Sequence, residues 1–184
     1  MVEMVRLGWE RPAIVRVIAK VEQSTILKST TLLEEATMTA LAVQPLLDAI
    51  RTHTDDEDLL ARVQVPATGR EFHLLHRDDG VEVWLIAWAP SASTGFHDHG
   101  TATTAFTVLK GSLVEHNWLG GLQIADIGPG DARAHAAGHV HDVRNVGSRP
   151  AFSVHAYSPR LDAMHHYHFL GDRIRLIGAE PGRP

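Results

Sequence analysis

The turn sequences that follow Pro66 at regular intervals constrain the fold of this chain more than any other feature. Short apolar runs alternate there with glycine-rich turns, which are "DDG" at 78–80, "KG" at 110–111, "GG" at 120–121 and "GPGD" at 128–131. Such residues reverse the chain between strands, and many short strands at even spacing are typical of an all-β sandwich or barrel. We therefore expect about eight to ten strands between residues 70 and 158.

The first third of the chain has a helical pattern instead. The segment "TLLE" at 31–34 fits a capping box, and apolar residues recur at helical spacing until Pro45. A short helix is expected around 46–50, and "TDDE" at 54–57 predicts the start of another. The sequence thus predicts a mainly β fold with a helical N-terminal segment.

We expect one domain with a short segment at either end. Residues 1–28 have no clear period and are expected to be an extension that need not be ordered. The domain itself would comprise a helical part at 29–65 and a β-barrel at 66–178, and residues 179–184 would form a tail. A length of 184 residues suits one domain with a sizeable core.

Composition excludes several classes of function. The chain has no cysteine, so any metal must be held by nitrogen or oxygen, and disulfides and cysteine nucleophiles are excluded. The formal net charge of −5 gives no basic footprint, so we expect no nucleic-acid partner. No apolar run approaches the roughly 20 residues of a membrane span, and residues 1–28 lack the apolar run of a secretory signal. We therefore expect no membrane partner and a cytoplasmic location.

The 13 histidines are many for this length, and two of them form an H-x-H pair in "GFHDHGTAT" at 95–103. Side chains at positions i and i+2 of a strand point the same way, so His97 and His99 would face one side and Asp98 the other. That arrangement suits two ligands of one metal ion. A pair of half-exposed strand histidines is the alternative that this motif alone leaves open.

A second motif favours the metal interpretation. In "GHVHDVRNV" at 138–146, the spacing Gly138-x-x-His141-x-x-x-Asn145 resembles the second motif of the cupins, and "HDH…LKGSL" resembles the first. The resemblance implies a cupin-type β-sandwich or barrel, also called a jelly roll. His139 shares the face of His141 by strand parity, but only His141 has the required spacing to Asn145.

The cupin resemblance implies three metal ligands, which are His97, His99 and His141. Cupins usually add a glutamate a few residues after the H-x-H pair, but this chain has only threonine and alanine at 101–104. Three neutral imidazoles leave the ion its full charge, in contrast to the two histidines and one carboxylate of many non-haem iron oxygenases. Such a site favours an anionic ligand, for example a thiolate whose proton the metal displaces.

Four strings together resemble the cysteine dioxygenase family of cupins over about residues 30–170, and they are "WLIAWAPSASTGFHDHG", "FTVLKGSLVEHNW", "HDVRNVG" and "AFSVHAYSPRL". The resemblance implies an enzyme that holds Fe(II) and adds both atoms of O2 to the sulfur of a small thiol, giving a sulfinic acid. It also implies catalytic roles for Ser153, His155 and Tyr157, which match the Ser-His-Tyr relay of this family. In that relay, Tyr157 donates a hydrogen bond to oxygen or substrate and His155 fixes the tyrosine hydroxyl.

Two departures from the family concern a cross-link and the substrate. Some members join the active-site tyrosine to a cysteine whose counterpart here is near Thr104, so this chain cannot form the cross-link. Members usually bind the substrate carboxylate with an arginine on the strand "REFHLLHR", where the family's tyrosine and arginine fall on Phe72 and Leu74. Arg70 lies on the same face by parity and is our candidate for substrate binding, because a guanidinium pairs with a carboxylate through two hydrogen bonds. The expected substrate is cysteine or another small thiol such as 3-mercaptopropionate.

Two other functions remain open. A cupin isomerase or other oxygenase would act on a small non-thiol acid, and a non-catalytic cupin would bind a metal or small molecule without turnover. We expect a small-molecule thiol and O2 as partners of a monomer or small homo-oligomer. The last histidine cluster, "MHHYHF" at 164–169, is expected to pack across the barrel mouth with Tyr167 and Phe169 inward, and not to form a second metal site.

Overall fold

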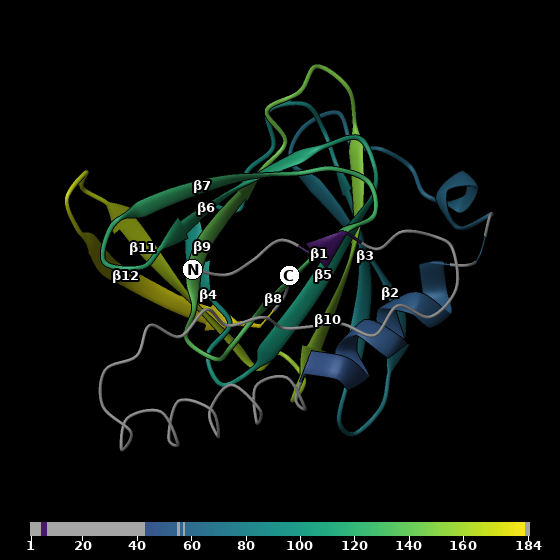
Figure 1. Ribbon diagram of the computed structural model, residues 1–184, viewed down its shortest axis with the longest axis horizontal. Coiled ribbons are helices and arrows are strands. Elements are labelled where there is room, and N and C mark those ends of the chain that lie inside the picture. Colours follow the sequence, from purple (N-terminus) through teal and green to yellow (C-terminus); the bar gives the residue numbers. More distant parts are fainter. Residues whose placement is uncertain (1–4, 7–42, 55, 57, 183–184) are drawn as a thin grey trace, which may run out of the picture.

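The computed structural model describes residues 5–6, 43–54, 56 and 58–182 (Figure 1). The extension expected at 1–28, apart from residues 5–6, lies outside the described residues. Most of the helix expected to end at Pro45 lies outside them as well.

The helical part differs from the sequence-based expectation. Helical residues run from 43 to 54 and continue through Pro45, because the proline ring itself adopts a helical φ. This helix packs on the β-structure through the buried side chains of Leu46 and Ile50. The Thr54 hydroxyl donates to the backbone oxygen of Arg51 at 3.1 Å, and the capping box expected at 54–57 involves Glu57, which lies outside the described residues. Only a 3-10 helix, η1 (Leu59–Arg62), follows in the described part of the chain.

Strands make up the rest of the described fold. They are β1 (Val5–Arg6), β2 (Arg70–Arg77), β3 (Glu82–Trp88), β4 (Phe96–Asp98), β5 (Thr103–Lys110), β6 (Leu113–Trp118), β7 (Leu122–Ile127), β8 (Asp131–His135), β9 (Val140–Arg144), β10 (Ala151–Ser158), β11 (Ala163–Phe169) and β12 (Ile174–Pro181). Nine of them, β2 to β10, lie between residues 70 and 158, within the expected eight to ten. The last strand continues to Pro181, beyond the end expected for the barrel at 178.

The strands form two antiparallel sheets that curl around a common interior (Figure 1). One sheet has the order β1-β8-β5-β10-β3-β2, and the other has the order β12-β11-β4-β9-β6-β7. Buried apolar side chains from both sheets meet between them, among them Phe106 and Val108 of the first sheet and Leu113 and Val143 of the second. The fold is therefore mainly β and of the cupin type that the sequence motifs predicted.

Strand register brings distant motifs together inside this sandwich. Strand β4 pairs with β9 so that His97 and His141 are direct partners. Strand β10 is central in the other sheet, between β3 and β5. Ser153 and Tyr157 therefore face the same interior from the opposite layer.

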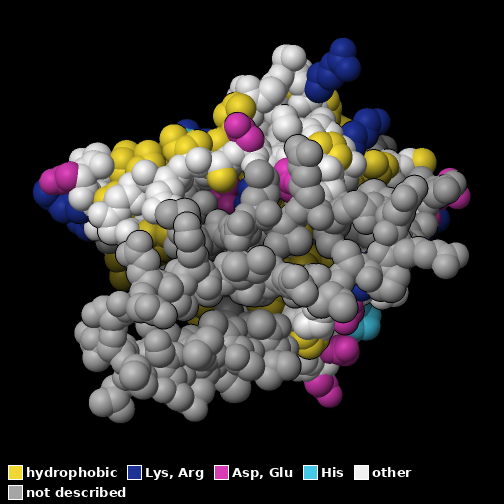
Figure 2. All heavy atoms as spheres, in the orientation of Figure 1, with side chains coloured by type: hydrophobic (Ala, Val, Ile, Leu, Met, Phe, Trp, Pro, Cys, Tyr) yellow, Lys and Arg dark blue, Asp and Glu magenta, His cyan; other side chains and the backbone are white. Residues whose placement is uncertain are grey.

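The surface shows two further features. Figure 2 shows exposed hydrophobic side chains over β6 and β7, where Ile124 is 62% exposed. Among the described residues there is no helix with the length and hydropathy needed to cross a membrane.

Candidate metal centre

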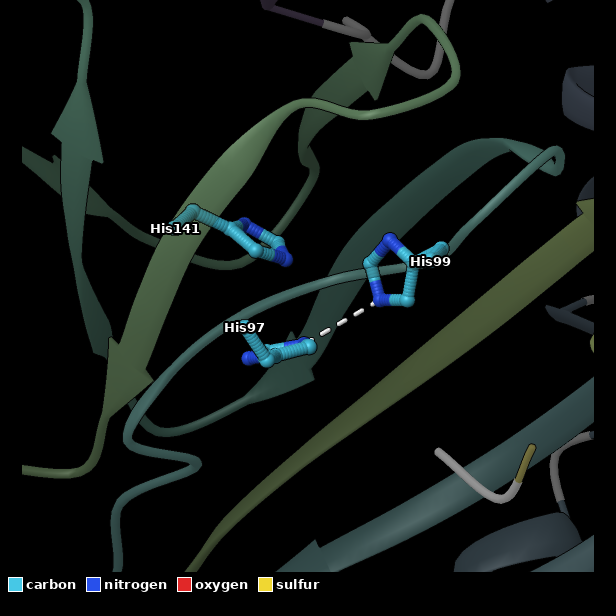
Figure 3. Close-up of side chains that lie close together, drawn as sticks. All are labelled: His97, His99 and His141. Carbon is cyan, nitrogen blue, oxygen red and sulfur yellow. Dashed lines mark hydrogen bonds between the residues drawn. The ribbon is translucent and has the colours of Figure 1, made fainter. Parts of the chain in front are cut away.

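Three histidines converge at the centre of the sandwich (Figure 3). His97, His99 and His141 are all buried, and one nitrogen of each lies within 4.8 Å of the other two. The Nε2 atoms of His97 and His99 are 3.1 Å apart. The Nε2 atom of His141 is buried and has no hydrogen-bond partner among the described residues. The structure thus brings together the three histidines that the cupin resemblance predicted as metal ligands.

The backbone around β4 holds the H-x-H pair in place. The carbonyl oxygen of Gly95 lies 2.9 Å from His97 Nδ1, which leaves His97 Nε2 to face the other histidines. Gly100 follows the pair with a φ of 58°, a left-handed conformation that favours glycine. Its N–H donates to Asp98 at 2.8 Å, so the turn after the pair is fixed by the residue between the two histidines.

Asp98 points away from His97 and His99, as strand parity predicted. Its carboxylate lies 2.8 Å from His165 Nδ1 and accepts a hydrogen bond from the Tyr167 hydroxyl at 2.6 Å. These contacts fasten β4 to β11. The metal-ligand groups found among the described residues include none of 164–169, and the packing expected for that cluster stays a prediction.

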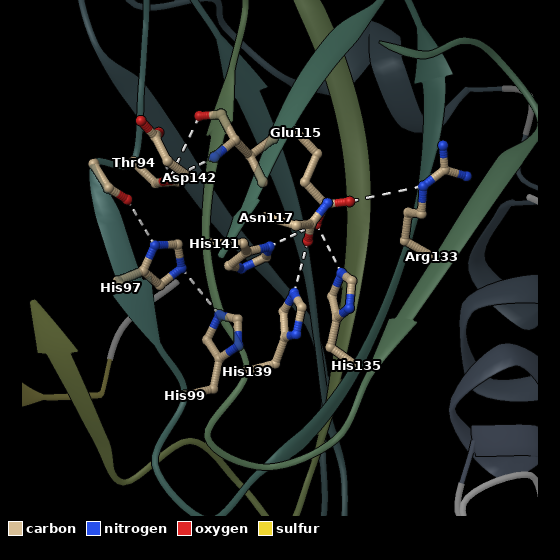
Figure 4. Close-up of polar contacts among 12 residues, drawn as sticks. Thr94, His97, His99, Glu115, Asn117, Arg133, His135, His139, His141 and Asp142 are labelled. Atoms are coloured by element: carbon tan, nitrogen blue, oxygen red, sulfur yellow. Dashed lines mark hydrogen bonds and ion pairs between the residues drawn. The ribbon is translucent and has the colours of Figure 1, made fainter. Parts of the chain in front are cut away.

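A carboxylate that sequence reasoning missed lies directly behind His141 (Figure 4). The Oε1 atom of Glu115 is 2.6 Å from His141 Nδ1 and 2.7 Å from His135 Nε2, and the side chain is fully buried. Burial alone raises the pKa of Glu115, but the hydrogen bonds from His135 and His141 outweigh it and hold that pKa well below its usual range. The centre therefore has a negative charge one imidazole away from the metal position.

The three histidines fit a divalent metal ion. Burial, followed by neighbouring imidazoles, lowers the pKa of His97 and His99 well below the usual value. Their rings are therefore neutral at neutral pH, with one nitrogen of each free of a proton, which is the form that binds metals. The Nε2 atom of His141, buried without a described partner, is the kind of atom that a bound ion would satisfy. Its Nδ1 bond to Glu115 is the outer contact that metal-binding histidines commonly have.

The predicted Ser-His-Tyr relay is only partly connected. Ser153 Oγ lies 2.8 Å from His155 Nε2, and both residues are buried. No hydrogen bond joins His155 to Tyr157 within the described part of the chain, and their ring centroids are 6.4 Å apart. Tyr157 instead lies beside His99, with ring centroids 5.1 Å apart, and burial raises its pKa. The phenol is therefore placed at the histidine centre and stays protonated.

Trp88 extends the relay on its other side. Its Nε1–H donates to Ser153 Oγ at 2.8 Å. An indole nitrogen can only donate, so Ser153 Oγ accepts there, and His155 Nε2 is the acceptor that the described residues offer to the Ser153 hydroxyl proton. His155 Nε2 is then the acceptor, and the imidazole has its proton on Nδ1. Burial lowers the pKa of His155 to about 3, so the ring is neutral.

Arg70 reaches the same interior from β2. Its guanidinium carbon lies 5.1 Å from the Phe72 ring centroid and 5.4 Å from that of Trp88, and its Nη1 is buried with no hydrogen-bond partner among the described residues. Burial is the main reason that the pKa values of His97 and His155 fall, and the Arg70 guanidinium lowers both further. Arg70 is therefore close enough to act on both sides of the centre.

The other early-strand positions bring no charge to the centre. Phe72 packs against the core, and Leu74 is 45% exposed. Arg70 thus supplies the cationic group on this strand that faces the histidines.

Several solved structures are similar to part of this chain. The TT1209 protein of Thermus thermophilus superposes with a TM-score of 0.50 at 23% identity, covering 56% of this chain and 95% of that one. A Klebsiella pneumoniae protein with a double-stranded β-helix domain gives a TM-score of 0.49 at 18% identity, covering 64% and 92%. A cupin superfamily protein of Desulfitobacterium hafniense gives 0.48 at 18% identity, covering 54% and 86%.

Two antiparallel sheets enclosing three convergent histidines define a cupin with a candidate metal centre. The model of the family described as cysteine dioxygenase type I matches residues 12–123, more than half of the chain. The chain belongs to the cysteine dioxygenase type I family.

Proposed function

We propose that the protein is an iron-dependent thiol dioxygenase that converts a small thiol carboxylate to its sulfinic acid. The observation that carries this proposal is the group of three buried histidines with an unpartnered His141 Nε2, flanked by Tyr157 and Arg70 in the described structure. Family membership supports the reaction class. Thiol dioxygenation transfers both oxygen atoms of O2 to one sulfur, so RSH and O2 give RSO2H and no external reductant is needed.

Fe(II) is the proposed cofactor, with His97, His99 and His141 as its ligands. A ferrous ion held there would supply O2 activation and lower the pKa of the substrate thiol. The chain contributes neutral imidazoles and the negative charge of Glu115 behind His141. Apolar burial around the centre keeps bulk water away from the histidines.

Arg70 is the proposed contact for the substrate carboxylate. The buried Nη1 of Arg70 has no hydrogen-bond partner in the described structure. A substrate carboxylate beside it would supply an acceptor. Tyr157 is the proposed donor to oxygen or substrate, since a protonated, buried phenol beside His99 has a proton to donate. No hydrogen bond links His155 to Tyr157 in the described structure. His155 and Ser153 are therefore proposed to position Tyr157 through packing on β10.

Oxygen consumption by iron-reconstituted protein tests the proposal. Protein loaded anaerobically with Fe(II) should consume O2 with cysteine or 3-mercaptopropionate and yield the sulfinate. Cysteamine, which lacks the carboxylate, should be a poor substrate. The His97→Ala variant should lose iron and activity together, and Arg70→Gln should raise KM for the thiol carboxylates more than it lowers kcat.

Two outcomes would contradict different parts of the proposal. Stoichiometric iron with no oxygen uptake on any thiol would leave the metal centre and remove the reaction. Turnover in which cysteamine equals 3-mercaptopropionate, with no change in Arg70→Gln, would keep the reaction and remove the role of Arg70.

The remaining expectations stay predictions. They concern a cytoplasmic location, the lack of nucleic-acid and membrane partners, and a monomer or small homo-oligomer. Gel filtration of the full chain tests the last of these.

A further inference from the structure

A second group of polar side chains lies behind His141, on the side away from His97 and His99 (Figure 4). One nitrogen each of His135, His139 and His141 lies within 4.8 Å of the other two. The rings of His135 and His139 stack with centroids 4.0 Å apart and planes 2° apart. The proposed dioxygenase activity uses neither of these two histidines.

A cavity of about 370 Å³ leads to this group. Its lining includes Leu119 and Ile124, which are exposed on the β6–β7 hairpin, and extends inward to the buried Glu115. His135 and His139 also line it. An ion could therefore reach these histidines from solvent without passing the three-histidine centre.

One oxygen of Glu115, a residue that lines the cavity, makes no hydrogen bond within the described structure. Its Oε1 contacts His135 and His141, whereas Oε2 is buried and accepts no hydrogen bond from any described residue. The nearby cation is Arg133, whose Nε is 3.7 Å from Oε2, too long for a hydrogen bond. The two terminal nitrogens of Arg133 donate to backbone oxygens of Ala132 and Asp126, so the guanidinium meets the carboxylate only through the ion pair of its Nε.

We propose that His135 and His139, together with the Glu115 carboxylate that contacts His135, form a second divalent-cation site, separate from the centre made by His97 and His99. Two imidazoles and a carboxylate are a common three-ligand set for zinc, with a fourth position left for water. The ion takes the place of the proton shared between His135 and Glu115, which is released on binding. His141 Nδ1 keeps its hydrogen bond to Glu115 when the ion binds. The carboxylate is therefore a ligand of the second site and a hydrogen-bond partner of His141 in the first.

The local charge selects the class of ion. Arg133 offsets the charge of Glu115, so the carboxylate alone offers little attraction to Mg²⁺ or Ca²⁺, which prefer sets of oxygen ligands. The affinity must come from the imidazoles. The site therefore fits ions that bind imidazole well, namely Zn²⁺, Co²⁺, Ni²⁺ and Cu²⁺.

Metal stoichiometry tests the second site directly. The full chain, stripped with a chelator and titrated with Co²⁺ or Zn²⁺, should retain two equivalents after gel filtration. The His139→Gln variant should retain one, because His139 lies outside the strands and its described hydrogen bond goes to Asn117, not to Glu115 or the first centre. The double variant His97→Ala/His99→Ala should also retain one, held by the second site.

The matched control is His168→Gln, which removes an exposed histidine from β11 and should leave two equivalents. Retention of a single equivalent by the wild-type chain would overturn the proposal, as would two equivalents in His139→Gln. If circular dichroism shows that His139→Gln does not fold, the comparison of wild type with His97→Ala/His99→Ala decides. Two equivalents in the wild type and one in the double variant support the second site. One equivalent in the wild type and none in the double variant refute it. Loss of thiol oxidation with two ions bound would count against the proposed function alone.

Discussion

Trp88 controls the direction of hydrogen bonding beside the histidine centre. The indole N–H can only donate, so Ser153 accepts from it, and His155 Nε2 is the acceptor that the described structure offers to the Ser153 proton, which places the proton of His155 on Nδ1. The tautomer of His155 is thus set by three buried side chains, which are Trp88 on β3 and Ser153 and His155 on β10. The neutral ring that results can offer Nδ1–H, and not a lone pair, to the side away from Ser153.

Replacing Trp88 by phenylalanine should release this tautomer. In wild-type protein, the ¹⁵N spectrum of His155 should show a protonated Nδ1 and an unprotonated Nε2. In Trp88→Phe, the Ser153 oxygen loses its indole donor, so a bond in which His155 Nε2–H donates to that oxygen becomes favourable and the Nε2–H tautomer should appear. Ser153→Ala serves as the control because it removes the hydroxyl but keeps the indole. A protonated Nε2 in the wild type would show that the chain of bonds runs the other way.

Some residues of the centre could be predicted from the spacing of their motifs in the sequence, whereas others become apparent only when the strands are paired. His97, His99 and His141 were predictable because their motifs lie on the chain at recognisable spacing. Glu115 was not predicted because the cupin resemblance places a carboxylate shortly after the H-x-H pair, and Glu115 lies further along the chain. Its one signal in the sequence is parity with Leu113, which places a charged side chain at an inward position of β6.

Among the elements, the glycine turns were predictable and their tolerance to substitution was not. Gly111 and Gly120 both follow strands and both have a left-handed backbone, with φ of 79° and 76°. A Cβ at Gly120 would meet nothing within 4 Å, whereas one at Gly111 would lie 2.8 Å from the carbonyl oxygen of Pro150. The difference comes from the approach of the β5–β6 turn to β10, which is a long-range contact that no local pattern encodes.

Alanine substitution of these two glycines gives a matched comparison. Gly120→Ala should cost about 1 kcal/mol of unfolding free energy, the ordinary penalty for a left-handed residue with a Cβ. Gly111→Ala should cost clearly more, because backbone atoms of Pro150 and Ala151 must also move. Urea denaturation of both variants measures the difference. Equal losses would mean that the turn after β5 shifts freely and does not fix the start of β6.

The helical elements were the least predictable. Pro45 and Thr54 carry boundary signals, but the described helix runs past the first and uses the hydroxyl of the second within its own last turn. Packing of Leu46 and Ile50 on the sheet decides where this helix lies. Alternation of apolar residues, by contrast, reports directly on which face of a strand is buried, which is why the β-region was anticipated better.

At the scale of the whole molecule, the fold buries several histidines as neutral groups. His97, His99, His135 and His155 are all at most 5% exposed, and burial is the first cause of the lowered pKa in each. In the unfolded chain these histidines titrate near the ordinary value of about 6.5. In acid, the unfolded metal-free chain therefore binds protons at these histidines that the folded protein does not bind.

The metal-free protein should accordingly lose stability as the pH falls from 7 to 5. His155 titrates at about 3 in the fold, so below a pH of about 6.5 the unfolded state binds a proton that the native state does not. Each such histidine contributes a slope of up to about 1.4 kcal/mol per pH unit, with stability decreasing toward acid. Urea unfolding at several pH values should show this slope reduced by about one proton in His155→Gln and unchanged in the exposed variant His168→Gln.

The range above pH 5 keeps the titration of Glu115 out of the measurement, since an unfolded glutamate protonates near about 4.3 and would add loss of the same sign only at lower pH. An unchanged slope in His155→Gln would mean that this imidazole is as easily protonated in the fold as outside it.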